Sequence, residues 1–186
     1  MPPAPGRSVY AAPMPTLFLL LSLCGCLGLA AHAQPTRPVP AHAAPANPKY
    51  VRTPTGFLLV LRQGDDVLRE LEELARRENI PSASLTGLGF GHPTFGFWNA
   101  QTKTYAPKAF RDLELASLTG SLAWKDGKPA LHLHGVGADK DFRPVGGHLL
   151  ALEVGTGSVE LTIVVHDKKL NRAEDPRNGA TVLGLE

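Results

Sequence analysis

The chain has 186 residues, of which 43% are hydrophobic and 19% are charged, and its formal net charge is +2 at pH 7. This length predicts one folded domain. The near balance of basic and acidic residues argues against nucleic acid as a partner, because nucleic-acid binding needs clustered positive charge.

The N-terminal segment has the pattern of an export signal. An apolar run at 17–31 follows a segment in which Arg7 is the only charged residue, and Ala31-His32-Ala33 supplies a small-x-small cleavage site. We expect residues 1–33 to be a signal peptide and the protein to be periplasmic or secreted. The run is too short and too interrupted by glycine for a membrane span. As an alternative, Leu23-Cys24-Gly25-Cys26 resembles a lipobox in which Cys26 would carry a lipid anchor, although Cys24 departs from that pattern.

Both cysteines of the chain lie in this leader, so the mature protein would use neither disulfides nor thiol chemistry. Residues 34–48 are rich in proline and alanine and predict an extended linker. We place the folded domain at 49–186, with its core at 51–165.

The first elements of the domain are a strand and a helix. Residues 56–62 form an apolar run of strand length, and Asp65 and Asp66 supply a turn and a helix N-cap. Apolar residues then recur at helical spacing from Val67 until Pro81, with charged residues between them. This pattern predicts one amphipathic helix.

A glycine-rich segment follows at 87–91. Residues 82–91 predict a strand that ends in a glycine-rich turn, and 94–99 predict the start of the next strand. The segment lacks the Lys-Ser/Thr of a phosphate loop and no helical pattern follows it, so we expect a tight strand connection. Trp98 is expected to be a core or interface aromatic.

The second half of the domain predicts strands joined by short turns. Asp126-Gly127 is a strong hairpin signal, Gly155-Thr156-Gly157 predicts another turn, and the segment from His166 to the last residue predicts a loosely packed tail. The predicted strands are 110–124 with a bulge near Gly120, 130–136, 146–154 and 158–165. The fold class is therefore α+β, with a mostly antiparallel sheet and one main amphipathic helix.

Three histidines in this half indicate a metal site. His132 and His134 alternate with leucines, so both side chains lie on one face of a strand, separated by about 6.6 Å of rise. His148 on a neighbouring strand would complete a facial set for a divalent transition metal ion, with zinc as the expected ion and one position open to water or a small anion. Alternatively, the three histidines are half-buried polar residues that hydrogen-bond across the sheet or a subunit boundary.

An open position on such an ion allows catalysis as well as binding. Metal-bound water has a pKa of about 7, and a carboxylate could act as its general base. The candidates for this base are Glu114, Asp139 and Asp141. Lys140 and Arg143, in the polar loop 137–143, are candidates for binding an anionic ligand.

Several separated motifs resemble the plant and prokaryote conserved (PPC) domain family, over roughly 51–165. They are Gly64-Asp65-Asp66-Val67, the segment 80–89, the segment 113–120, Leu131-His132-Leu133-His134 and Gly146-Gly147-His148-Leu149. The resemblance implies a compact α+β domain that assembles as a trimer, with the histidine-bearing strands near a metal site in prokaryotic members. In plants the domain resembles an oligomerisation and partner-binding module attached to AT-hooks that bind DNA. This chain has no Arg-Gly-Arg-Pro hook, so the DNA role is not carried over.

There is also a physical reason to expect a trimer. A sheet with many glycines and few aromatics exposes an edge and a face that other subunits could cover. We therefore expect an exported, trimeric binding module that holds a divalent metal ion through three histidines, with an unidentified small ligand or protein partner. The alternative is a zinc-dependent hydrolase that uses metal-bound water.

Overall fold

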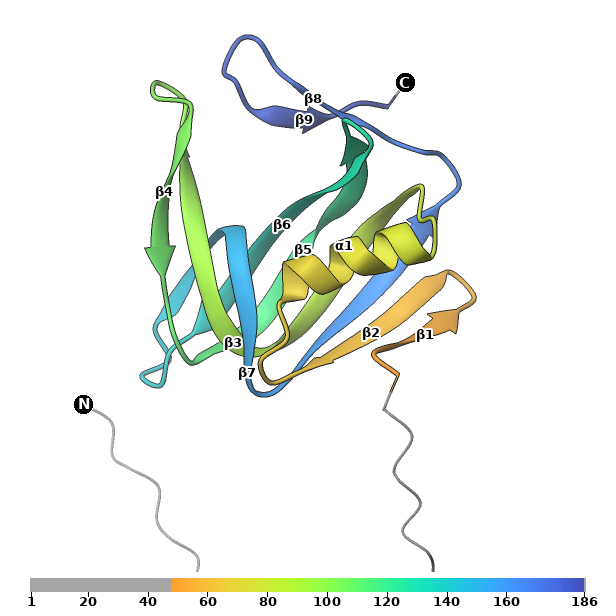
Figure 1. Ribbon diagram of the computed structural model, residues 1–186. Helices are drawn as coiled ribbons and strands as arrows, with labels where there is room; N and C mark the ends of the chain where they lie inside the picture. The colour runs from red at the N-terminus through yellow and green to blue at the C-terminus, as the bar shows by residue number, and fades with distance from the viewer. Residues whose placement is uncertain (1–47, 186) are drawn as a thin grey trace, which may run out of the picture. The chain divides into compact units, whose positions relative to one another are not determined.

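The computed structural model describes residues 48–185, and Figure 1 shows how their helix and strands are arranged. The predicted signal peptide, the linker up to residue 47 and the lipobox cysteine lie outside these residues. The elements are β1 (Tyr50–Thr53), β2 (Gly56–Arg62), α1 (Val67–Arg77), β3 (Ser82–Asn99), β4 (Thr104–Ala109), β5 (Leu113–Lys125), β6 (Lys128–Ala138), β7 (Pro144–His166), β8 (Arg172–Glu174) and β9 (Thr181–Leu183).

Seven strands form one antiparallel sheet, and β8 and β9 form a separate hairpin. The order in the large sheet is β1-β2-β7-β6-β5-β3-β4, and β3 also pairs with β7. As a result, β3, β7, β6 and β5 close a ring of antiparallel pairs, which leaves fewer free sheet edges. The predicted α+β fold with a mostly antiparallel sheet is confirmed. No helix among residues 48–185 is both long and apolar enough to cross a bilayer.

Helix α1, the one helix of residues 48–185, lies across one face of the sheet (Figure 1) and begins where the sequence predicts. The Asp66 carboxylate accepts a hydrogen bond from the Arg69 backbone N–H at 3.1 Å, which caps the first turn. The helix buries Val67, Leu71, Leu74 and Ala75 against the apolar side of the sheet. The other face of the sheet is therefore not covered by this helix.

The glycine-rich segment is not a turn, and this corrects the sequence prediction. Strand β3 continues through it from Ser82 to Asn99. A Cβ atom at Gly87 would lie 2.3 Å from the Glu160 carbonyl oxygen, and one at Gly89 would lie 2.4 Å from the Ser158 carbonyl oxygen. These glycines therefore let β7 approach closely while β3 bends, rather than reversing the chain.

The predicted turn at Gly155-Thr156-Gly157 is also absent, because β7 is one strand from Pro144 to His166. Along β3, the partner on β7 changes from Val159 opposite Gly89 to Val154 opposite Gly91. The additional residues of β7 are accommodated as an irregularity in the pairing, which bends the strand instead of ending it.

Two further expectations are corrected in β5 and at the C-terminus. The register of β5 against β6 shifts between Leu115 and Ser117, whereas Gly120 pairs regularly with Leu133. The last residues are not a loose tail, because β8 and β9 pair there and the side chains of Leu170 and Arg172 are buried.

Candidate metal centre

The structure brings the three predicted histidines together. His132 and His134 lie two positions apart on β6, and His148 on β7 is directly paired with His134. One ring nitrogen from each histidine lies within 4.8 Å of the others. The three ring centroids are 5.1 to 5.2 Å apart, so no imidazole is turned away from the group.

These distances fit a tetrahedral ion with nitrogen ligands. Two nitrogens bound at 2.0 to 2.1 Å to such an ion are separated by about 3.3 Å. The Nε2 atoms of His132 and His134 are already 3.2 Å apart. The remaining gaps, which are below 4.8 Å, can close by small rotations of the side chains.

The environment keeps two of the rings in the neutral form that binds metal. Burial, followed by the neighbouring histidines, lowers the pKa of His148 to about 4. Burial also lowers the pKa of His132, with smaller contributions from Arg172 and His134. Both rings are therefore uncharged at pH 7 and have a lone pair available.

An aromatic wall, formed by Tyr105 and Trp98, supports His148. The Tyr105 ring stacks on the His148 ring at 4.5 Å with an interplanar angle of 14°. Trp98 packs edge-on against Tyr105 at 4.9 Å, and burial raises the pKa of the Tyr105 hydroxyl. Gly96 lies opposite His148 on β3, and a Cβ there would come within 2.9 Å of the Tyr105 ring. The wall therefore fixes the plane of the His148 ring by packing.

Sequence reasoning missed both Tyr105 and Arg172 at this site. The Arg172 guanidinium donates to the Ser121 Oγ at 2.6 Å and to the Ala130 carbonyl at 3.3 Å. Ser121 is directly opposite His132 in the register of β5 and β6. Arg172 was missed because its segment has the composition of a polar tail. Tyr105 and Arg172 both lie far from the histidines in the sequence.

The predicted carboxylates do not join the histidines. Glu114 lies on β5 opposite Ala138, five positions away from Thr119, the residue that is opposite His134. Within residues 48–185, the group of side chains placed to bind one ion contains the three histidines alone.

The charged residues of the β6–β7 loop are engaged with one another. The Asp139 carboxylate accepts hydrogen bonds from the backbone and guanidinium of Arg143, which lowers the pKa of Asp139. Asp141 forms ion pairs with Lys140 at 2.8 Å and with Arg143 at 3.0 Å. The charged side chains of this loop therefore pair with one another and not with the histidines.

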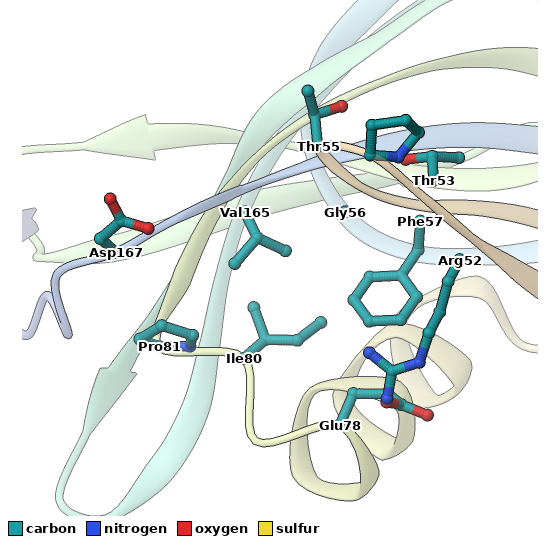
Figure 2. A pocket seen from close by; sticks show the side chains of 11 residues that line it. Arg52, Thr53, Thr55, Gly56, Phe57, Glu78, Ile80, Pro81, Val165 and Asp167 are labelled. Carbon is teal, nitrogen blue, oxygen red and sulfur yellow. The ribbon is translucent and has the colours of Figure 1, made fainter.

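Two pockets lie beside the helix and away from the histidines. The smaller, of about 360 Å³, lies between the β1–β2 turn and the end of α1, and Figure 2 shows Arg52 reaching to Glu78 at its edge. Its apolar lining includes Phe57, Ile80 and Val165. The other, of about 640 Å³, lies between β1 and α1. No histidine lines either pocket.

Comparison with known proteins gives one family and several similar structures. Residues 48–167 match the Plants and Prokaryotes Conserved (PCC) domain. No curated protein sequence matches the chain.

Three of the similar structures carry different descriptions. A candidate DNA-binding protein of Ralstonia eutropha JMP134 is 54% identical, with a TM-score of 0.73, over 75% of this chain and 97% of that chain. A metal-containing protein of Archaeoglobus fulgidus is 31% identical, with a TM-score of 0.62, over 68% of this chain and 90% of that chain. A plant- and prokaryote-conserved (PPC) protein of Pyrococcus horikoshii is 26% identical, with a TM-score of 0.62, over 69% of this chain and 91% of that chain.

The domain match covers the whole of the large sheet and the helix, and it includes the three histidines. The family resemblance inferred from the separated motifs is therefore confirmed, and this chain belongs to the Plants and Prokaryotes Conserved (PCC) domain family.

Proposed function

We propose that this protein is an exported, trimeric binding module in which His132, His134 and His148 hold a divalent metal ion, with zinc as the expected ion. The observation that carries the proposal is the convergence of three ring nitrogens within 4.8 Å. The metal-containing relative from Archaeoglobus fulgidus supports it. When bound, the ion supplies a Lewis-acidic position for a ligand atom. The chain supplies the three nitrogens and the aromatic wall that orients one of them.

Binding is favoured over hydrolysis by the placement of the acidic residues. A general base must lie within hydrogen-bond reach of the proton that it removes. Glu114 lies several residues along β5 from the histidines, and Asp139 and Asp141 are bonded within their own loop. We therefore propose a ligand-binding role and not the zinc hydrolase.

The trimer proposal is supported by the sheet face that the helix leaves uncovered. A row of exposed residues crosses this face from β7 through β3 and β5 to β6, namely Thr162, Thr86, Thr119 and His134. Leu88, Val136 and Val164 on the same strands are 55%, 49% and 40% exposed. Such an apolar and weakly charged face is suited to contact with a second copy of the chain.

The proposed partner is not nucleic acid, although the Ralstonia eutropha relative is described as a candidate DNA-binding protein. The formal net charge of this chain is only +2. Lys140 and Arg143 of the β6–β7 loop and Arg177 of the C-terminal hairpin are paired with carboxylates. Cationic side chains engaged in this way are poorly placed to follow a phosphate backbone.

Metal analysis of protein purified without an affinity tag tests the site. We expect about one zinc ion per chain in the wild type and a loss of it in His134→Ala, because two nitrogens hold a divalent ion far more weakly than three. His92→Ala is the matched control, since His92 instead accepts a hydrogen bond from the Asp112 backbone N–H at 3.1 Å. Only trace metal in all three proteins would disprove the metal centre.

Export is tested separately by the intact mass of the mature protein from its native host. Cleavage after Ala33 gives a chain that begins at Gln34, whereas lipidation gives an acylated chain that begins at Cys26. A chain that retains residues 1–33 would contradict export.

A further inference from the structure

Arg172 is a buried cation without a counter-charge. Arg172 is only 7% exposed, and its guanidinium donates hydrogen bonds to one hydroxyl and one backbone carbonyl. Among residues 48–185, no carboxylate lies within ion-pair distance of Arg172, and its Nη1 donates no hydrogen bond to the protein. Arg177 on the same hairpin, in contrast, pairs with Asp175 at 2.6 Å. A buried charge is costly unless it is paired, so the Arg172 environment lacks an anion.

The guanidinium lies beside the histidines. It is held by Ser121, which is opposite His132, and by Ala130, which lies two residues before His132 on β6. The positive charge of Arg172 contributes to the lowered pKa values of both His132 and His148, as expected for a cation close to both rings. A divalent ion on the three histidines would add two further positive charges, with no protein carboxylate among its ligands.

We propose that Arg172 and the metal centre together form a binding site for a small oxyanion, a carboxylate or phosphate group, with one oxygen at the open position of the ion and another accepting from the guanidinium. This inference rests on the proposed function and names the ligand class of the same site. Arg172 lies beyond residues 48–167, which match the family model. The guanidinium has five N–H groups, and those that do not bond to Ser121 and Ala130 can donate to that second oxygen.

The test uses the full mature protein with cobalt(II) bound in place of zinc. Inorganic phosphate and acetate are each titrated into this protein. The visible absorption of the cobalt ion reports an anion at its open position, and metal content is measured in parallel.

Three variants are compared with the wild type. Arg172→Met removes the positive charge but keeps a side chain of similar length, and Arg172→Lys keeps the charge without the planar guanidinium. Arg177→Met is the control on the same hairpin. We expect Arg172→Met to raise the Kd of the tighter anion by about 10- to 100-fold with unchanged metal content, and Arg177→Met to leave it unaltered. Arg172→Lys should be intermediate, and it replaces Arg172→Met if that variant does not fold.

Each other outcome is also decisive. Metal-loaded Arg172→Met that binds both anions as tightly as the wild type would overturn the inference. If no variant holds metal, the proposed function fails. Calorimetric titration of the metal-free proteins with phosphate then decides the role of Arg172. Loss of phosphate binding in Arg172→Met supports that role, and equal or absent binding refutes it. If the wild type binds neither anion while Arg172→Met shifts the sedimentation toward monomer, the counter-charge comes from a neighbouring subunit and the small-anion site is excluded.

Discussion

At the scale of single residues, Gly120 decides where His132, one of the proposed metal ligands, lies. A Cβ atom at Gly120 would lie 2.0 Å from the His132 carbonyl oxygen and 2.8 Å from the Leu133 Cα. A backbone atom cannot move aside as the end of a flexible side chain can. The absence of a side chain at Gly120 therefore allows β6 to pair closely with β5 at the position of His132.

The substitution Gly120→Ala should disturb both stability and metal binding. We expect the free energy of unfolding to fall by about 3 kcal/mol, near the upper end of overpacking effects, and the metal content to fall because β6 moves at His132. Chemical denaturation and metal analysis measure the two effects. Gly127→Ala is the control, because a Cβ there meets nothing within 4 Å and only its φ of +75° is strained. Metal content that falls equally in both variants would show that Gly120 has no particular role.

At the scale of elements, the β8–β9 hairpin holds Arg172 against β5 and β6. The Asp175 carbonyl accepts hydrogen bonds from the backbone of Asn178 at 3.3 Å and of Gly179 at 2.7 Å, which closes the turn. The Asp175 carboxylate accepts from the Arg177 guanidinium at 2.6 Å. A carboxylate thus organises the turn of the hairpin that carries Arg172.

This ion pair predicts a pH dependence of stability. Hydrogen bonds from the Arg177 side chain lower the pKa of Asp175 to about 2, whereas an unfolded aspartate titrates near 3.9. Because the folded pKa is the lower one, the stabilisation is fully present above about pH 4 and is lost as the pH falls toward 2. The difference in unfolding free energy between the wild type and Asp175→Asn should follow this course in urea titrations. A difference that is constant from pH 5 to pH 2 would contradict it.

At the scale of the whole molecule, the two faces of the sheet have different neighbours. One face packs against α1, where Leu71 is fully buried, and the other carries the threonine row and the histidines. If copies of the chain meet on that second face, the metal centre lies next to a subunit boundary. Assembly and ligand binding would then be linked through the same surface.

The substitution Thr86→Lys should dissociate the proposed trimer. Thr86 is exposed at the centre of the row, between Thr162 and Thr119, and a buried lysine without a partner is costly in an interface. Analytical ultracentrifugation at micromolar concentration should show a trimer for the wild type and monomers for the variant. Val51→Lys, at a residue 51% exposed on the edge strand β1, should remain trimeric. A monomeric wild type would disprove the assembly, and a trimeric Thr86→Lys would exclude this face.

The sequence alone determined the features that depend on neighbouring residues. The Asp66 cap and the helix, the Asp126-Gly127 hairpin, and the shared face of His132 and His134 follow from capping, turn chemistry and the two-residue period of a strand. The separated motifs also identified the family, although they could not supply the packing.

Only the tertiary structure decided which distant segments meet. The continuity of β3 and β7 through their glycines, the stacking of Tyr105 on His148 and the docking of Arg172 on Ser121 all depend on the register between strands far apart in the chain. A shift of one residue in that register would turn a side chain to the opposite face. Local composition does not encode such a register, because it is set by the packing of the whole sheet around the common core.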